Sequence, residues 1–229
     1  MFIGLMIISA IFAGIGWLVQ NRLKSKFERY NQVSLSNGLS GREIAQKMLA
    51  QHGIYDVQIV QGQGTLTDHY NPQTKTVSLS PEIYQGRSVM AAAVAAHECG
   101  HAVQHAKAYS MLQLRSQLVP LVQLSASLQQ YFFMFAFALF AYMNNPIFIL
   151  IAIILFGITT AFSLVTLPVE FDASHRAMTW LKDSGMTRSS EYDGVKDALK
   201  WAAMTYVTAA LAAIAQLLYL VWMFLGSRD

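Results

Sequence analysis

The stretch His97-Glu98-Cys99-Gly100-His101 holds the residues of this chain best suited to metal chemistry. Two histidines four residues apart lie on the same face of an α-helix, where both imidazoles can bind one zinc ion. Glu98 is rotated by about 100° from His97, so its carboxylate is expected to flank the metal rather than bind it. A glutamate in that place can act as general base towards the attacking water. The motif therefore predicts a Zn²⁺ site with Glu98 as the catalytic residue.

The residues around the motif predict the helix that it needs. Residues 89–106 are rich in alanine, the strongest helix former, and their small side chains allow other elements to approach closely. Cys99 is the only cysteine of the chain, which excludes an intrachain disulfide. It is expected to face away from the two histidines as a small buried residue, with a redox sensor as the alternative.

A catalytic zinc takes three protein ligands and keeps its fourth position open, so the motif requires one more ligand. His105 lies about 12 Å beyond His97 along the helix axis and is excluded. Asp68 and His69 lie on a predicted strand. Glu170 and Asp172 lie beside a predicted membrane span, where an acidic side chain is costly and is usually kept for a function. We favour Glu170, at the start of a new helix. Asp172 is then the alternative ligand, the acceptor for a ligand histidine N–H, or an ordinary acid at a helix N-terminus.

Composition predicts a membrane protein. The 229 residues are 54% hydrophobic and only 13% charged, and the mean hydropathy is +0.36. Net charge is +3 and no nucleic-acid motif occurs, so no nucleic-acid partner is expected. Four apolar stretches approach the roughly 20 residues that cross a bilayer. They are residues 2–19, 121–143, 147–167 and 201–225, and none contains a charged residue.

Lysine and arginine predict the orientation of these spans. Ten of them lie between the first and second spans and five between the third and fourth, whereas the turn at 144–146 has none. Cytoplasmic segments carry this excess, so both basic segments and the zinc site are expected at the cytoplasmic side of a prokaryotic plasma membrane. The first span lacks a basic start and a cleavage site, which favours a retained anchor over a signal peptide.

The predicted organisation follows from these spans. Residues 1–20 form the first transmembrane helix, 21–118 a cytoplasmic segment, 119–167 a transmembrane hairpin, 168–200 a second cytoplasmic segment and 201–226 the fourth transmembrane helix. In 21–118, Ser40 and Glu43 form a capping box, and strands near 55–60, 66–70 and 76–79 form a small β-meander before the zinc helix. Pro168 marks a kink or the first turn of a new helix. The fold class is a mainly α membrane protein with an α+β zinc segment.

Three stretches carry a resemblance to a known family: Leu66-Thr67-Asp68-His69-Tyr70, His97 through Gln104, and Pro168-Val169-Glu170-Phe171-Asp172-Ala173-Ser174. The chain resembles the YugP-like family of membrane zinc peptidases over nearly its whole length. More distantly it is similar to HtpX-like proteases, in which a glutamate on a later helix completes a gluzincin-like zinc site. Those relatives usually carry an acid where Ser174 stands. His175 occupies a place where the nearer family is expected to have arginine.

The resemblance implies a neutral zinc metallopeptidase. The expected function is endoproteolysis at the cytoplasmic face of the membrane, with lipid bilayer and polypeptide as partners and membrane proteins among the substrates. His69, Tyr70, His175 and Arg176 are candidates to stabilise the oxyanion. Two alternatives are a catalytically silent scaffold with structural zinc and a site-2-type intramembrane protease. The latter needs an Asp-Gly inside a span, whereas Asp193-Gly194 lies among charged residues.

Overall fold

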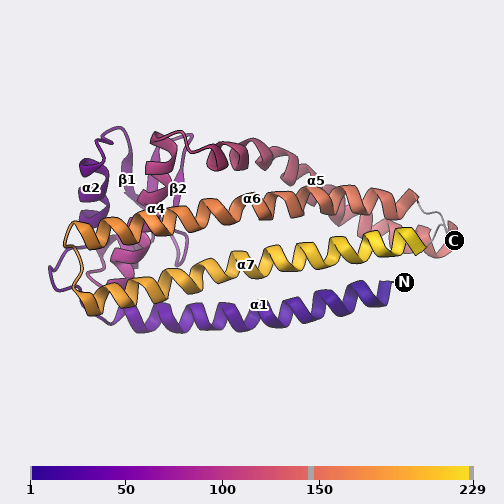
Figure 1. Cartoon of the computed structure of the whole chain (residues 1–229), viewed down its shortest axis with the longest axis horizontal. Helices are drawn as coiled ribbons and strands as arrows, with labels where there is room; N and C mark the ends of the chain where they lie inside the picture. The colour runs from indigo at the N-terminus through magenta and orange to yellow at the C-terminus, as the bar shows by residue number, and fades with distance from the viewer. Residues whose placement is uncertain (1, 144–146, 227–229) are drawn as a thin grey trace. The chain divides into compact units, whose positions relative to one another are not determined.

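The computed structural model describes the backbone of residues 2–143 and 147–226, and it is mostly helical. The side chains of residue 2 and of residues 133–143 lie outside the described part. The helices are α1 (Phe2–Asn31), α2 (Gly41–Gln51), α3 (Pro81–Gln85), α4 (Val89–Ala106), α5 (Ser110–Met143), α6 (Ile147–Asp183) and α7 (Ser189–Gly226). The strands are β1 (Gln58–Gln61), β2 (His69–Asn71) and β3 (Thr76–Leu79). Figure 1 shows α1, α6 and α7 as long helices, and their two ends belong to different compact units.

Two compact units divide the chain. Unit 1 comprises Met1–Val19, Leu114–Leu167 and Thr205–Asp229, and unit 2 comprises Gln20–Gln113 and Pro168–Met204. Unit 1 is held together partly by side-chain hydroxyls that reach neighbouring helices. Ser125 Oγ donates to Leu155 O at 2.9 Å, and Thr160 Oγ1 lies 3.3 Å from Ala213 O. Contacts of this kind stabilise helix pairs where water is scarce.

Three helices among the described residues are long and apolar enough to cross a membrane: Ile3–Asn31, Ile147–Asp183 and Ser189–Gly226. They contain the first, third and fourth predicted spans. Much of the second predicted span, 121–143, and the whole predicted turn 144–146 fall on residues whose side chains or backbone lie outside the described part. Four spans therefore stay a prediction.

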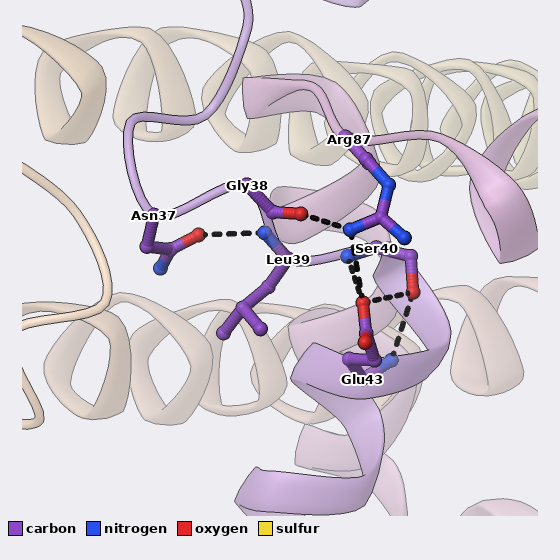
Figure 2. Close-up of polar contacts among 6 residues, drawn as sticks. All are labelled: Asn37, Gly38, Leu39, Ser40, Glu43 and Arg87. Atoms are coloured by element: carbon purple, nitrogen blue, oxygen red, sulfur yellow. Dashed lines mark hydrogen bonds and ion pairs between the residues drawn. The ribbon is translucent and has the colours of Figure 1, made fainter.

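The core of unit 2 is built on α2 and α4. Ser40 caps α2 and Glu43 closes the predicted capping box, because Glu43 Oε2 accepts the Ser40 backbone N–H at 2.7 Å. Arg87 reaches the same corner and contacts both Gly38 O and Glu43 (Figure 2). The box fixes where α2 starts, so that Ile44 and Met48 are fully buried in the core that contains α4.

The sheet differs from the predicted meander. Its order is β1-β3-β2, with β1 parallel to β3 and β2 antiparallel to β3. In a meander, β1 would pair with β2. Here the chain after β1 crosses to the far edge of β3, so β1 and β2 lie on opposite sides of β3 and each pairs with β3 instead. The prediction is therefore wrong in strand order, although the small sheet before α4 is present. Both β1 and β2 are consequently edge strands among the described residues.

The chain continues as one helix through Pro168, which lies inside α6. The expectation of a new helix at this residue is therefore wrong. Proline removes one backbone N–H from the helical ladder, a loss that a long apolar helix packed against neighbours can absorb. Val169 and Ala173, on either side of Glu170, are fully buried. Glu170 and Asp172 are thus interior helix residues, and the N-terminal dipole reading of Asp172 is wrong as well.

Candidate metal centre

Helix α4 carries the histidine motif and is almost entirely buried. Ser88 caps it by accepting the Ala91 N–H at 3.1 Å, and alanines follow through the first two turns. Gly100, inside the motif, faces the backbone of α6. A Cβ placed on Gly100 would lie only 2.5 Å from Ala173 O, so glycine allows the two helices to approach this closely. That approach brings α6 side chains to the motif histidines.

His97, His101 and Glu170 meet between these two helices. Glu170 Oε2 lies 3.3 Å from His97 Nε2 and 3.6 Å from His101 Nε2. The two imidazole rings are edge-on to each other, with centroids 4.8 Å apart. Glu170 is 2% exposed and both rings are largely shielded from solvent. Within the described part of the chain, this is the group of histidine, cysteine and acidic residues placed to hold a metal ion.

The donor set fits zinc. Bonds of about 2.0–2.1 Å in a tetrahedron put neighbouring ligand atoms roughly 3.3 Å apart. The two distances from Glu170 Oε2, 3.3 and 3.6 Å, are close to that edge length. Two imidazole nitrogens and one carboxylate oxygen make three protein donors, which leaves the fourth tetrahedral position for water or substrate. This is the donor number of catalytic rather than structural zinc sites.

Both histidines are also held through Nδ1. Gln104 Oε1 lies 3.0 Å from His101 Nδ1, and Ser174 Oγ lies 3.1 Å from His97 Nδ1. The sequence alone predicted neither of these two contacts. The signal for Gln104 was its position three residues after His101 on the same helix, where side chains are neighbours. Ser174 gave no such signal, because its contact depends on how α6 lies against α4.

The structure places Asp172 next to Gln104 rather than next to a ligand histidine. Its Oδ2 accepts Gln104 Nε2 at 2.8 Å and Arg176 Nε at 2.5 Å, one turn later on α6. Arg176 in turn lies over the Tyr109 ring at 5.8 Å. Asp172 therefore contacts a residue that contacts His101, and it is not in the three-residue metal group. His175, between these residues in sequence, is exposed on α6.

Asp68 and His69 are not in the metal group. Asp68 accepts the backbone N–H of Ser80 at 2.7 Å and lies 3.2 Å from the Ser80 hydroxyl. Burial, followed by the nearby Glu98 carboxylate, raises the pKa of Asp68 above its ordinary value. His69 is exposed on β2, and its Nδ1 lies 2.8 Å from Thr67 O. The structure therefore gives Asp68 a local structural contact and an acidic neighbour in Glu98.

His105 is held away from the metal group, as helix geometry requires. Its Nδ1 lies 2.7 Å from the hydroxyl of Tyr70, on β2. Desolvation and the charge of Asp56 raise the pKa of Tyr70 to about 12, so the hydroxyl keeps its proton at physiological pH and can donate to His105. The pair joins the C-terminal turn of α4 to the edge strand.

The electrostatics of the metal group favour a cation. Burial acts to lower the pKa of His101, but the Glu170 carboxylate and Glu98 outweigh it, so the net pKa of His101 is raised. Glu98 itself is buried on α4, 8% exposed, directly after His97. Two carboxylates beside two imidazoles thus form an acidic site that attracts positive charge, whether carried by protons or by a metal ion.

The fold and this donor set define a class of protein: mostly helical, with three helices among the described residues long and apolar enough to cross a membrane, and with a two-histidine, one-glutamate group that could hold a metal ion. The chain belongs to the family described as "Putative neutral zinc metallopeptidase", whose model matches residues 5–225. "Putative membrane protease YugP" of Bacillus subtilis (strain 168) is 41% identical over 216 residues, which cover 94% of this chain and 94% of the relative. No solved structure gives a match. The resemblance inferred from the three sequence stretches is confirmed.

Proposed function

We propose that this protein is a zinc-dependent endopeptidase, embedded in the membrane, that hydrolyses peptide bonds of membrane or membrane-associated proteins at the cytoplasmic face. The observation that carries the proposal is the meeting of His97, His101 and Glu170 with distances that suit tetrahedral zinc. The family to which the chain belongs and the printed name of its relative support peptide hydrolysis and a membrane setting.

Each residue of the centre has a role in this proposal. His97 Nε2, His101 Nε2 and Glu170 Oε2 are the ligands, and when zinc is bound it supplies Lewis acidity that polarises the scissile carbonyl and makes the attacking water more acidic. Glu98 is the general base: it accepts the water proton and delivers it to the leaving amine. Burial of Glu98 suits this role, because a base shielded from bulk solvent keeps the proton for the leaving group.

The substrate is proposed to bind as an extended strand. β2 pairs with β3 on one side, and its other edge has no partner strand among the described residues. β2 also contacts α4, which carries Glu98. An extended peptide can add to such an edge through main-chain hydrogen bonds. Of the oxyanion candidates, His69 and Tyr70 lie on this strand, whereas Arg176 is engaged by Asp172.

Proteolysis by the purified full-length protein in detergent tests this function. We expect cleavage of an unfolded protein such as casein, its loss on zinc chelation and its return on adding zinc. Glu98→Gln should lower the cleavage rate by about 10²–10⁴-fold, because the base is lost while the ligands stay. The matched control is Glu82→Gln, which neutralises an exposed acid on α3.

Two outcomes would count against the proposal. Cleavage that survives both chelation and Glu98→Gln would belong to another activity. Zinc bound by a wild-type protein that cleaves none of a panel of unfolded and membrane-protein substrates would favour the structural-zinc scaffold.

A further inference from the structure

The buried side chain of Gln104 connects α4 to α6. Gln104 is fully buried, and its Nε2 lies 2.7 Å from Val169 O and 2.8 Å from Asp172 Oδ2. Its Oε1 lies 3.0 Å from His101 Nδ1. A buried amide with three contacts from three residues has no freedom to rotate without losing hydrogen bonds that water cannot replace.

These contacts fix which way the amide points. Val169 O is a carbonyl and Asp172 Oδ2 belongs to a carboxylate that Arg176 also contacts, so both are acceptors. Only the NH₂ end of Gln104 can satisfy the two of them, and the carbonyl end must therefore face His101. An amide oxygen only accepts, so the ring nitrogen opposite it must carry a proton.

The consequence lies on the other side of the imidazole ring. A neutral histidine with its proton on Nδ1 has its lone pair on Nε2, and His101 Nε2 is the atom that faces Glu170. This is the tautomer that binds a metal through Nε2. We propose that Gln104 is a positioning residue that holds His101 in this tautomer, and that Asp172, held by Arg176, keeps Gln104 in the required orientation.

The contact at Nδ1 of His97 does not fix a tautomer. Its Nδ1 lies 3.1 Å from the Ser174 hydroxyl, which can donate or accept and so imposes neither tautomer. Gln104 is therefore expected to affect His101 selectively. The consequence for metal binding rests on the proposed zinc site. Without zinc, the Glu170 carboxylate 3.6 Å from His101 Nε2 competes for the proton on that atom, so the effect of Gln104 is measured with this charge removed.

The test uses nitrogen NMR of the full-length, zinc-free protein labelled with ¹⁵N-histidine, at a pH where His101 is neutral. Every sample carries Glu170→Gln, which keeps the size of the side chain but removes the charge that competes for a proton on Nε2. With Gln104 present in this background, we expect His101 to carry its proton on Nδ1 alone. Gln104→Met, of similar volume but without either polar end, should give a mixture of the two tautomers at His101 and leave His97 unchanged. Ser174→Ala is the matched control, and it should alter the His97 signals without affecting those of His101.

Zinc affinity provides a second measurement. Gln104→Met should weaken zinc binding by about 10–100-fold, the usual effect of losing a partner of a metal-binding histidine. Asp172→Ala should weaken it less, because Gln104 keeps Val169 O. If Asp172 acts through Gln104, adding Asp172→Ala to Gln104→Met should cost nothing more. This comparison is made within variants whose circular dichroism matches that of the wild type.

The outcomes separate this inference from the proposed function. An Nε2–H tautomer at His101 in Glu170→Gln, or an unchanged Nδ1–H tautomer when Gln104→Met is added to it, would overturn it. So would additive losses of zinc affinity from Gln104→Met and Asp172→Ala. Should Gln104→Met fail to fold, Gln104→Leu takes its place: a mixed tautomer at His101 in that variant supports the inference, and a pure Nδ1–H tautomer there opposes it. A wild type that binds no zinc would refute the metal site but leave the tautomer measurement valid.

Discussion

Cys99 lies inside the histidine motif but takes no part in the metal group. It is fully buried, its Sγ lies 3.7 Å from Ala45 O, and burial followed by the charge of Glu98 raises the pKa of its thiol. A thiol with a raised pKa carries almost no thiolate at neutral pH and cannot react without access. These features favour the small buried residue over the redox sensor.

Cys99 is therefore predicted to be unreactive in the folded protein. Maleimide at pH 7–8 should leave the native protein unmodified, and one adduct should form once the protein is denatured. Mass spectrometry of the intact chain measures both. Rapid labelling of the native protein would mean that the thiol is accessible and that this part of α4 is not packed as described.

At the scale of single residues, the sequence predicts those site residues that belong to one helix and are related by its period. His97, Glu98 and His101 follow from the period of α4, and His105 is excluded by the rise of the same helix. Gln104 has the right spacing too, but its role depends on Asp172 and Val169 O, some 65 residues later in the chain. The role of Ser174 likewise depends on a contact between distant parts of the chain, with His97. Contacts between distant helices depend on their relative rotation, which spacing within each helix does not determine.

Two helices, α4 and α6, form the centre, and their close approach depends on Gly100. Alanine there would place its methyl 2.5 Å from Ala173 O, a distance that forces the backbones apart. Since Glu170 and Ser174 lie on the α6 turns that flank Ala173, any separation moves them from both histidines. The glycine is thus required by packing between elements and not by its own backbone conformation.

Gly100→Ala is predicted to lose zinc affinity by at least about tenfold and to lower the melting temperature, as overpacking typically costs about 1–3 kcal/mol. Zinc titration and thermal unfolding in detergent measure these effects. Gly157→Ala, on α6 where the added methyl meets open space, is the control and should be neutral. Equal behaviour of the two variants would show that α4 and α6 do not approach as closely as described.

Elements were predicted best where their signals are local. The capping box placed the start of α2, and the alanine-rich stretch placed α4. The sheet order and the continuity of α6 were missed for a shared reason. Turn residues between β1 and β2 indicate that the chain reverses, but they do not indicate which edge of β3 it reaches next. A proline indicates that one backbone N–H is lost, but not whether neighbouring elements compensate for the loss.

At the scale of the whole molecule, the sidedness of the membrane protein remains a proposal that rests on lysine and arginine. Single cysteines at Thr74, an exposed residue in the β2–β3 turn, and at Asn144, in the sequence between the second and third predicted spans, test it. A membrane-impermeant maleimide should label position 144 in intact cells and position 74 only after lysis. The buried Cys99 should contribute no background.

The reverse pattern would contradict the topology. Labelling of position 74 in intact cells would place unit 2 outside the cytoplasm and invert the orientation. Labelling of neither position from outside would contradict the four-span arrangement, which predicts that residues 144–146 are exposed on the far side.

The central claim is that His97, His101 and Glu170 hold zinc while Glu98 does not. Zinc content of purified full-length variants tests this directly, measured after equilibration with saturating zinc and removal of the unbound metal. We predict that Glu170→Ala loses zinc, that Glu98→Gln retains it, and that Asp172→Ala and Asp68→Ala retain it at saturating metal. Full zinc occupancy in Glu170→Ala, with metal lost instead from Asp172→Ala or Asp68→Ala, would contradict the claim and move the third ligand to that residue.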